Sequence, residues 1–287
     1  MANTQVIIRT ALALLAFAGN SLLCRLALKN TTIDAASFTS IRLISAALAL
    51  WAIIAFTSRD QTRKGDWPSA AALFIYAAGF SLAYINLSAG TGALLLFGSV
   101  QLCMIATGMI RGERFSPMQM AGLLLALAGL IGLVFPGLSA PPLVSSGLMI
   151  LAGLAWGVYS LRGRGSTNPL NTTAGNFLRT VPMTAAFSLA MLNSFKLDGL
   201  GVVYALASGI MTSGIGYAIW YSVLPHLKAT QAATLQLAVP VIAAIGAILI
   251  LGESASLRLV LASLAIICGI WLVIYERGRA AAAKVRP

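Results

Sequence analysis

The side chains of this chain that could bind a small molecule are aromatic and amide groups inside long apolar segments. Tyr76, Phe80 and Tyr84 recur every four residues, so a helix would carry them as one stripe. Gln101 lies near the centre of another apolar segment, where an amide needs a polar partner. Phenol hydroxyls, amides and ring faces suit the binding of neutral or zwitterionic solutes. Packing of the aromatic stripe and hydrogen bonding of Gln101 between helices are the structural alternatives.

Other candidates lie in further apolar segments. Ser213, Tyr217 and Trp220 share one helix face, and Trp156 lies within Gly153-x-x-x-Gly157, a pair better interpreted as close packing of helix backbones. The residues that we predict to contact a substrate are Asn20, Tyr76, Phe80, Tyr84, Phe97, Ser99, Gln101, Trp156, Ser213, Tyr217 and Gln236.

The acidic residues argue against several kinds of chemistry. All 7 Asp and Glu residues lie at the ends of apolar segments or in loops, and the 1 histidine is His226, close to a segment end. Proton relays and sites for lipophilic cations usually need a buried carboxylate, and an enzyme needs a nucleophile with its base or a metal cluster. We therefore predict no catalytic residues, no metal and no cofactor. The 3 cysteines, Cys24, Cys103 and Cys268, are interpreted as small buried hydrophobic residues.

Two arginines inside apolar segments leave a second possibility open. Arg42 and Arg179 occupy corresponding places in the two halves of the chain, 137 residues apart. They could hold an anionic group, or they could extend toward the membrane surface and bind helix carbonyl groups.

The elements that must position these side chains are membrane-spanning helices. The chain has 287 residues, of which 59% are hydrophobic and only 9% charged, whereas a soluble domain carries roughly 25% charged residues. A helix needs about 20 residues to cross a bilayer. Ten segments meet this need: Val6–Leu28, Asp34–Phe56, Pro68–Leu87, Gly90–Ile110, Ser116–Phe135, Ser145–Leu161, Leu170–Leu192, Gly199–Ser222, Ala229–Leu251 and Leu257–Tyr275. Ala16-Phe17-Ala18 resembles a signal-peptidase site, but the apolar run continues to Leu28, so we expect an uncleaved first span.

The net charge of +12 indicates orientation rather than nucleic-acid binding. One set of segment ends, which includes both termini, holds thirteen cations, and the other set holds only Lys29 and Lys196. By the positive-inside rule both termini are cytoplasmic, and we expect a multi-pass protein of the bacterial inner membrane. The thirteen are Arg9, Arg59, Arg63, Lys64, Arg111, Arg114, Arg162, Arg164, Lys228, Arg277, Arg279, Lys284 and Arg286.

Internal similarity indicates a duplication. A shift of 140 residues aligns Gly112-Glu113 with Gly252-Glu253, and a shift of 138 aligns Gly19 with Gly157. The two halves are 1–140 and 141–287, with five segments each. Because five is odd, the second half would cross the membrane inverted. Inverted repeats are typical of secondary transporters, which bind substrate near the midplane between the repeats.

Short motifs recur in the two halves. They are Gly216-Tyr217-Ala218-Ile219-Trp220-Tyr221, Lys228-Ala229-Thr230-Gln231-Ala232-Ala233, Pro240 and Leu251-Gly252-Glu253 in the second half, and Ser88-Ala89-Gly90-Thr91-Gly92-Ala93-Leu94-Leu95 with Gly112-Glu113 in the first. With these motifs the second half resembles the EamA-type family of the drug/metabolite transporter superfamily, and within that superfamily the chain looks most like the YddG-type amino-acid exporters. The first half follows the same pattern, except that Val100 stands where the second half has Pro240. The resemblance implies ten helices, alternating access and a central cavity lined mainly by segments 1, 3, 4, 6, 8 and 9.

Together these features predict an all-α polytopic membrane protein with two inverted five-helix repeats around a central cavity. We expect it to export amino acids or similar small neutral or zwitterionic metabolites. A drug or other-metabolite exporter is the alternative, and a channel is a less favoured one. The expected partners are a small-molecule substrate and the lipid bilayer, without nucleic acid. A monomer is compatible with the sequence, and so is a homodimer.

Overall fold

The computed structural model describes residues 4–57, 65–110, 112, 115–137, 140–163, 166–227, 232 and 235–283. All regular elements in these residues are helical. A π-helical segment η2 (Ser208–Ile215) joins α8 to α9, and two 3-10 turns, η1 (Leu192–Ser194) and η3 (Leu224–His226), follow α7 and α9. The α-helices are α1 (Thr4–Asn30), α2 (Ala35–Thr57), α3 (Trp67–Tyr84), α4 (Ala89–Ile110), α5 (Pro117–Val134), α6 (Leu143–Gly163), α7 (Pro169–Ala190), α8 (Gly199–Ala207), α9 (Gly216–Val223), α11 (Ala238–Leu251) and α12 (Leu257–Ala283).

Several helices begin where a capping side chain precedes a proline. Asp66, Ser116 and Asn168 each accept a hydrogen bond from a backbone N–H of the first turn, and a proline follows within two residues. Gln119 completes a capping box with Ser116. These local signals explain why α3, α5 and α7 begin within a residue of the positions expected from sequence.

The Asp66 carboxylate also ties the start of α3 to the end of α6. Arg162 Nη2 lies 2.8 Å from Asp66 Oδ1. Partial burial raises the pKa of Asp66, but hydrogen bonds from Ser69 and Arg162 outweigh burial and hold the pKa below its usual value. Both partners are nearly half exposed, so the ion pair contributes at most about 1 kcal/mol.

Seven of the described helical spans are long and apolar enough to cross a membrane, which is consistent with a polytopic membrane protein. The helices α3, α7 and α11 lie outside that set. Helices α3 and α7 carry more polar and aromatic residues, and α11 has only 14 residues. The sequence predicted one continuous ninth segment, Ala229–Leu251, but a turn at Leu237 precedes α11. Pro240 consequently lies in the first turn of α11, where its missing N–H costs no helical hydrogen bond.

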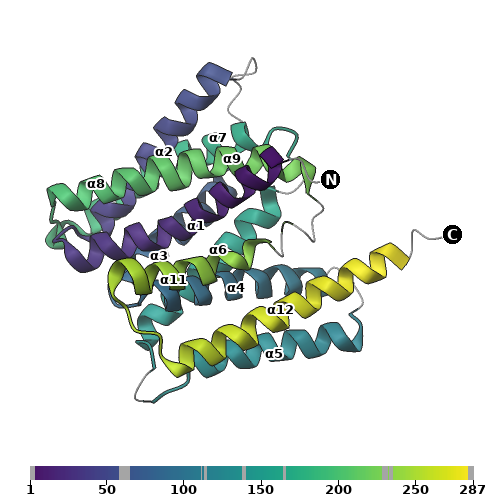
Figure 1. Ribbon diagram of the computed structural model, residues 1–287. Coiled ribbons are helices and arrows are strands. Elements are labelled where there is room, and N and C mark those ends of the chain that lie inside the picture. The colour runs from purple at the N-terminus through teal and green to yellow at the C-terminus, as the bar shows by residue number, and fades with distance from the viewer. Residues whose placement is uncertain are drawn as a thin grey trace.

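The helices form one bundle with two distinct ends. Helix α1 begins and α12 ends at the same end of the bundle, which we call the termini end; α6 ends and α7 begins there too (Figure 1). The opposite end, where α1 and α11 end and α8 begins, is called the distal end.

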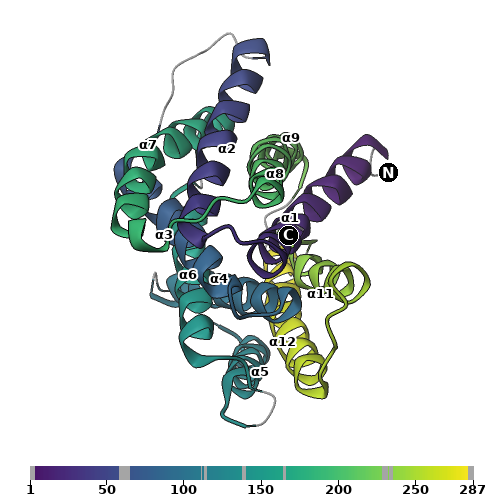
Figure 2. The ribbon, with the colours of Figure 1, turned by 90° about the vertical axis from the view of Figure 1, so that its left-hand side faces the viewer.

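The helix contacts in one half of the chain correspond to contacts in the other half. Helix α3 packs against α6, and α1 packs against α8 and α9; likewise α4 packs against α6, and α1 packs against α11. Helix α2 packs against α7. Helices α5 and α12 pack against each other and lie together at the edge of the bundle far from α7 (Figure 2). Exchanging the first five segments with the last five converts the contact of α3 with α6 into that of α1 with α8 and α9, and the contact of α4 with α6 into that of α1 with α11. The contacts of α2 with α7 and of α5 with α12 are converted into themselves.

The contact between α4 and α6 depends on glycines. A Cβ on Gly153 would lie 2.6 Å from the Leu96 carbonyl oxygen, and a Cβ on Gly157 would lie 2.8 Å from Cys103 Cβ. The two backbones therefore approach closely at this pair, which confirms the packing interpretation of Gly153-x-x-x-Gly157.

Replacing Gly153 by leucine is expected to separate α4 from α6 and to lower the free energy of unfolding by about 2 kcal/mol, as bulk added to a well-packed site does. The melting temperature of the purified protein in detergent measures the change. Gly147→Leu is the matched control, because Gly147 lies on the exposed side of the same helix and has open space within 4 Å of the place that a Cβ would take. Equal melting temperatures for the two variants would contradict the expectation.

Candidate functional site

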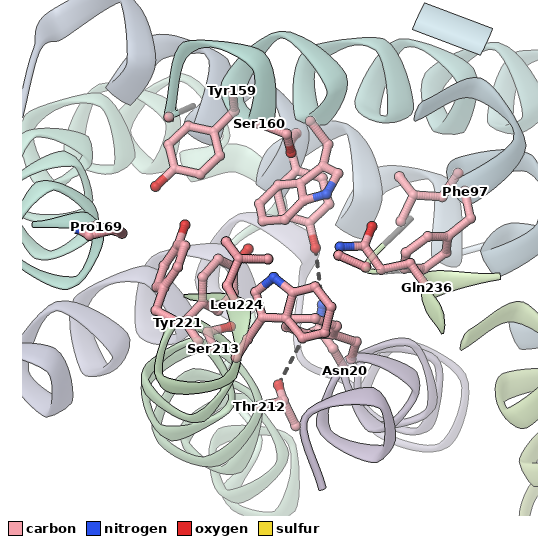
Figure 3. Close-up of a pocket in the computed structure, with 18 of the residues that line it drawn as sticks. Asn20, Phe97, Tyr159, Ser160, Pro169, Thr212, Ser213, Tyr221, Leu224 and Gln236 are labelled. Carbon is pink, nitrogen blue, oxygen red and sulfur yellow. Dashed lines mark hydrogen bonds between the residues drawn. The ribbon is translucent and has the colours of Figure 1, made fainter. Parts of the chain in front are cut away.

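A cavity of about 540 Å³ extends from the termini end, where Ser166, Pro169 and Leu224 line it, to the middle of the bundle. Figure 3 shows part of its wall. Its walls come from α1, α3, α4, α6, η2 and α9, with further residues from the segments that precede α7 and α11. The volume lies within the range of roughly 300–1,000 Å³ that is typical of small-molecule sites. We use the name cavity floor for the part of the wall that consists of Asn20 on α1, Tyr76 and Phe80 on α3, and Ser213 on η2.

The structure brings most of the sequence-predicted residues to this cavity. They come from helices far apart in the chain, and their contact with a substrate stays a prediction. Those in the wall are Asn20, Tyr76, Phe80, Phe97, Gln101, Trp156, Ser213, Tyr217 and Gln236.

Tyr84 and Ser99 lie elsewhere. Four residues turn an α-helix by about 400°, so the stripe that begins at Tyr76 drifts by about 40° at each step. The Tyr84 ring consequently packs over Gly92, and its hydroxyl donates a hydrogen bond to the Ala89 carbonyl oxygen at 3.3 Å. Ser99 packs against Gly153 in the contact between α4 and α6. Both residues therefore serve packing in this structure.

Aromatic rings form a continuous wall around Trp156. The centroid of the Trp156 ring lies 4.8 Å from that of Tyr76, 5.3 Å from that of Tyr159 and 5.4 Å from that of Tyr217. Phe17 contacts Tyr217 edge-on with a centroid distance of 5.6 Å. The wall links α1, α3, α6 and α9, and its ring faces can contact apolar or cationic parts of a solute.

A hydrogen-bond network connects three helices at the cavity floor. Asn20 Nδ2 donates to Tyr76 Oη at 3.1 Å. Asn20 Oδ1 accepts from Thr212 Oγ1 at 3.3 Å (Figure 3). The same oxygen accepts from Ser208 Oγ at 2.7 Å. The amide of Asn20 is therefore held in one orientation by α3 on one side and by η2 on the other.

The π-helical segment η2 brings this network close to α2. A Cβ on Gly209 would overlap the Arg42 carbonyl and the Ser45 hydroxyl, and a Cβ on Gly214 would lie 2.7 Å from Ala49 Cβ. The glycines thus allow η2 to pack directly on the α2 backbone. π-Helical turns often occur at functional sites.

Sequence reasoning missed several wall residues, among them Phe17, Thr212 and Tyr221. Two of them had a local signal: Phe17 precedes Asn20 by three residues, and Tyr221 follows Tyr217 by four, so both share a face with a predicted residue. The Tyr159 and Tyr221 side chains approach each other across the cavity with their hydroxyl ends (Figure 3). A rule that extended each predicted residue by one helical turn would have found Phe17 and Tyr221.

An ion pair links three segments of the chain at the distal end. Arg25 Nε lies 3.2 Å from Glu253 Oε1, and both side chains are largely buried. Arg25 Nη1 also donates to the carbonyl oxygens of Tyr84 and Ile85, at 2.8 Å each, and Glu253 Oε2 accepts from the Ala89 N–H at 2.8 Å. The pair therefore fastens α1 and the segment after α11 to the connection between α3 and α4.

The described wall of the cavity is electrically neutral. It contains hydroxyl, amide, aromatic and aliphatic side chains but no Asp, Glu, Lys, Arg or His. Within the described ranges no three His, Cys, Asp or Glu residues lie close enough to hold a metal ion. The wall can therefore bind a solute by hydrogen bonds and by contact with rings.

Comparison with known proteins identifies similar transporters. The model of a family described as the EamA-like transporter family matches residues 5–135 and 145–275. An uncharacterized protein of Pseudomonas aeruginosa is 53% identical over 98% of this chain and 99% of its own length. An uncharacterized transporter of Archaeoglobus fulgidus is 24% identical over 94% of this chain and 97% of its own. A crystal structure with 19% identity shares the fold, with a TM-score of 0.66 over 96% of this chain and 99% of that one.

Proposed function

The chain belongs to the EamA-like transporter family and is a membrane transporter, and from this premise we propose that it exports amino acids or similar small zwitterionic metabolites by alternating access. The neutral cavity carries the proposal. Its rings and hydroxyls suit a small solute with both polar and apolar parts, and the absence of acidic groups from the described wall disfavours lipophilic cations.

The proposed architecture is a pair of inverted five-helix repeats. Two observations support it: the family model matches the chain twice, at 5–135 and 145–275, and the helix contacts are exchanged when the halves are exchanged. In such an architecture the two repeats move against each other around a central site. The halves 1–140 and 141–287 are the proposed moving units.

The cavity and the ion pair describe one state of this cycle. The cavity reaches the termini end, whereas Arg25 and Glu253 fasten the distal end. With the termini in the cytoplasm, as the cation distribution favours, the structure corresponds to an inward-open state that loads solute from the cytoplasm of a bacterial cell.

Proteoliposomes loaded with labelled threonine, methionine or phenylalanine test the function directly. We expect saturable efflux that accelerates when an unlabelled amino acid is present outside, because a carrier returns faster when loaded. Efflux that does not saturate would indicate a channel, and absence of flux for every amino acid would overturn the proposal. Resistance of expressing cells to lipophilic cations would favour the drug exporter.

A further inference from the structure

Arg42 is a buried cation next to the cavity floor. Its side chain is 1% exposed and is among the largest fully buried side chains of the described residues. Its Nη2 donates to Tyr76 Oη at 3.0 Å, and its Nε lies 3.4 Å from Ser213 Oγ. The guanidinium carbon lies 5.0 Å from the centroid of the Phe80 ring and 5.3 Å from that of Tyr76. All three neighbours belong to the cavity floor.

This cation has no anionic partner among the described residues. The ion pairs there join Arg25 to Glu253 and Arg162 to Asp66, so Arg42 takes part in neither. Its Nη1 is buried and makes no hydrogen bond. Burying an unpaired charge is costly, and buried guanidinium groups are usually matched by a carboxylate or phosphate. Hydroxyls and ring faces satisfy only part of this need.

The Tyr76 hydroxyl is a second unused donor at the same place. Its oxygen accepts hydrogen bonds from Asn20 Nδ2 and from Arg42 Nη2. These two bonds occupy the oxygen lone pairs and leave the hydroxyl hydrogen to donate. The described residues supply no hydrogen bond in which it does so. Arg42 Nη1, which is buried behind the cavity floor, and the hydroxyl hydrogen of Tyr76, which belongs to the floor, therefore both lack an acceptor among the described residues.

We propose that Arg42 and Tyr76 bind the carboxylate of the transported solute, so that the carboxylate, and not the amino group, defines the substrate class. This proposal rests on the proposed function, because it takes the cavity to be the place where the transported solute binds. No described wall residue is acidic, so the amino group of an amino acid has only ring faces and neutral acceptors to contact. Carboxylates with a blocked or missing amino group are expected to bind as well.

A corresponding arginine provides a matched control. Arg179 occupies the equivalent place in the second half, but its Nη1 donates to the Gly175 carbonyl oxygen of its own helix at 3.0 Å. It is only half-buried. Neither arginine belongs to the cavity wall itself, but Arg42 is hydrogen-bonded to the wall residues Tyr76 and Ser213. Arg42 and Arg179 are therefore matched in charge and repeat position and differ in contact with the cavity floor.

The first experiment needs no variant. Three ligands derived from one amino acid are compared for stabilisation of the purified protein against heat: the free amino acid, its carboxamide and its N-acetyl form. We expect the carboxamide to bind on the order of a hundredfold more weakly than the free acid, as loss of a buried charge partner predicts. The N-acetyl form should bind within about tenfold of the free acid, because it keeps the carboxylate. Equal binding of acid and carboxamide, or binding by no carboxylate in the panel, would overturn the proposal.

The second experiment compares variants in the same assay. Arg42→Gln should lose the preference for acid over carboxamide, Arg42→Lys should retain part of it, and Arg179→Gln should match the wild type. A purely structural role of Arg42 would lower the melting temperature without changing that preference and would also overturn the proposal.

Efflux from proteoliposomes distinguishes failure of the proposed carboxylate site from failure of the proposed transport function. Carboxylate binding without amino-acid efflux would contradict the proposed function alone, whereas efflux of acid and carboxamide at equal rates would contradict only the role of Arg42.

Discussion

Replacing Glu253 by glutamine is expected to open the distal end of the bundle. The substitution removes the charge that neutralises Arg25 and leaves a largely buried cation without its partner. Breaking a buried ion pair in this way costs about 3 kcal/mol, the low end of the usual range. That energy corresponds to about a hundredfold change in the balance between the closed and the open distal end. The variant should therefore shift toward a state open on the distal side.

The buried thiol of Cys24 reports this opening, because Cys24 directly precedes Arg25 in α1 and is 0% exposed. With Cys103 and Cys268 replaced by serine, a membrane-impermeant thiol reagent added on the distal side should label Cys24 far faster in Glu253→Gln than in the wild type. Arg162→Gln is the control, since it breaks an ion pair at the termini end whose partners are nearly half exposed. Equal labelling of Glu253→Gln and wild type would show that the ion pair does not hold this end closed.

Replacing Trp156 by alanine is expected to weaken substrate binding strongly. Its ring contacts those of Tyr76, Tyr159 and Tyr217, so its removal takes away the centre of the aromatic wall. The three ring pairs stabilise the wall itself, whereas affinity falls through the lost contact between the indole ring and the solute. One aromatic contact of about 1.5 kcal/mol corresponds to roughly tenfold in affinity. KM for the best transported solute is the measurement.

Trp271→Ala is the matched control for Trp156→Ala. Trp271 also stacks on a neighbouring ring, that of Tyr275, but it lies on the exposed face of α12 at 47% exposure. Its replacement should leave KM nearly unchanged. A melting temperature measured for both variants separates loss of the binding wall from general loss of stability. Similar KM values for the two variants would contradict a binding role of the wall around Trp156.

The sequence was informative wherever a local rule decides the structure. Apolar length located the helices, and the capping residues and prolines that the structure shows at the starts of α3, α5 and α7 explain why those starts agree with the expected ones. The residues predicted near mid-segment mostly reached the cavity because a polar or aromatic side chain at that depth gains more from a cavity or a helix contact than from lipid. Tyr84 shows where a periodic stripe misleads: its spacing is that of Tyr76 and Phe80, but the drift of the helix turns it toward Gly92.

Contacts between distant segments were beyond sequence reasoning. Arg25 and Glu253 are 228 residues apart, and each alone is an ordinary charged residue near the end of an apolar segment. Arg42 and Arg179 could not be distinguished by their surroundings in sequence. The structure separates them, because one packs against a cavity wall and the other bonds to a carbonyl group of its own helix. Pairing of this kind depends on tertiary packing, which one sequence does not specify by local rules.

The π-helical segment η2 also sets the direction in which the residues after it point. In the proposed repeats, α3 with its 18 residues corresponds to the stretch from α8 through η2 to the end of α9 at Val223. Between these elements the shift that aligns the proposed halves changes from 137 at Arg42 and Arg179 to 140 at Glu113 and Glu253. Deleting a single residue of η2, such as the exposed Met211, would rotate the helix after it by about 100° and turn Tyr217 and Trp220 away from the cavity.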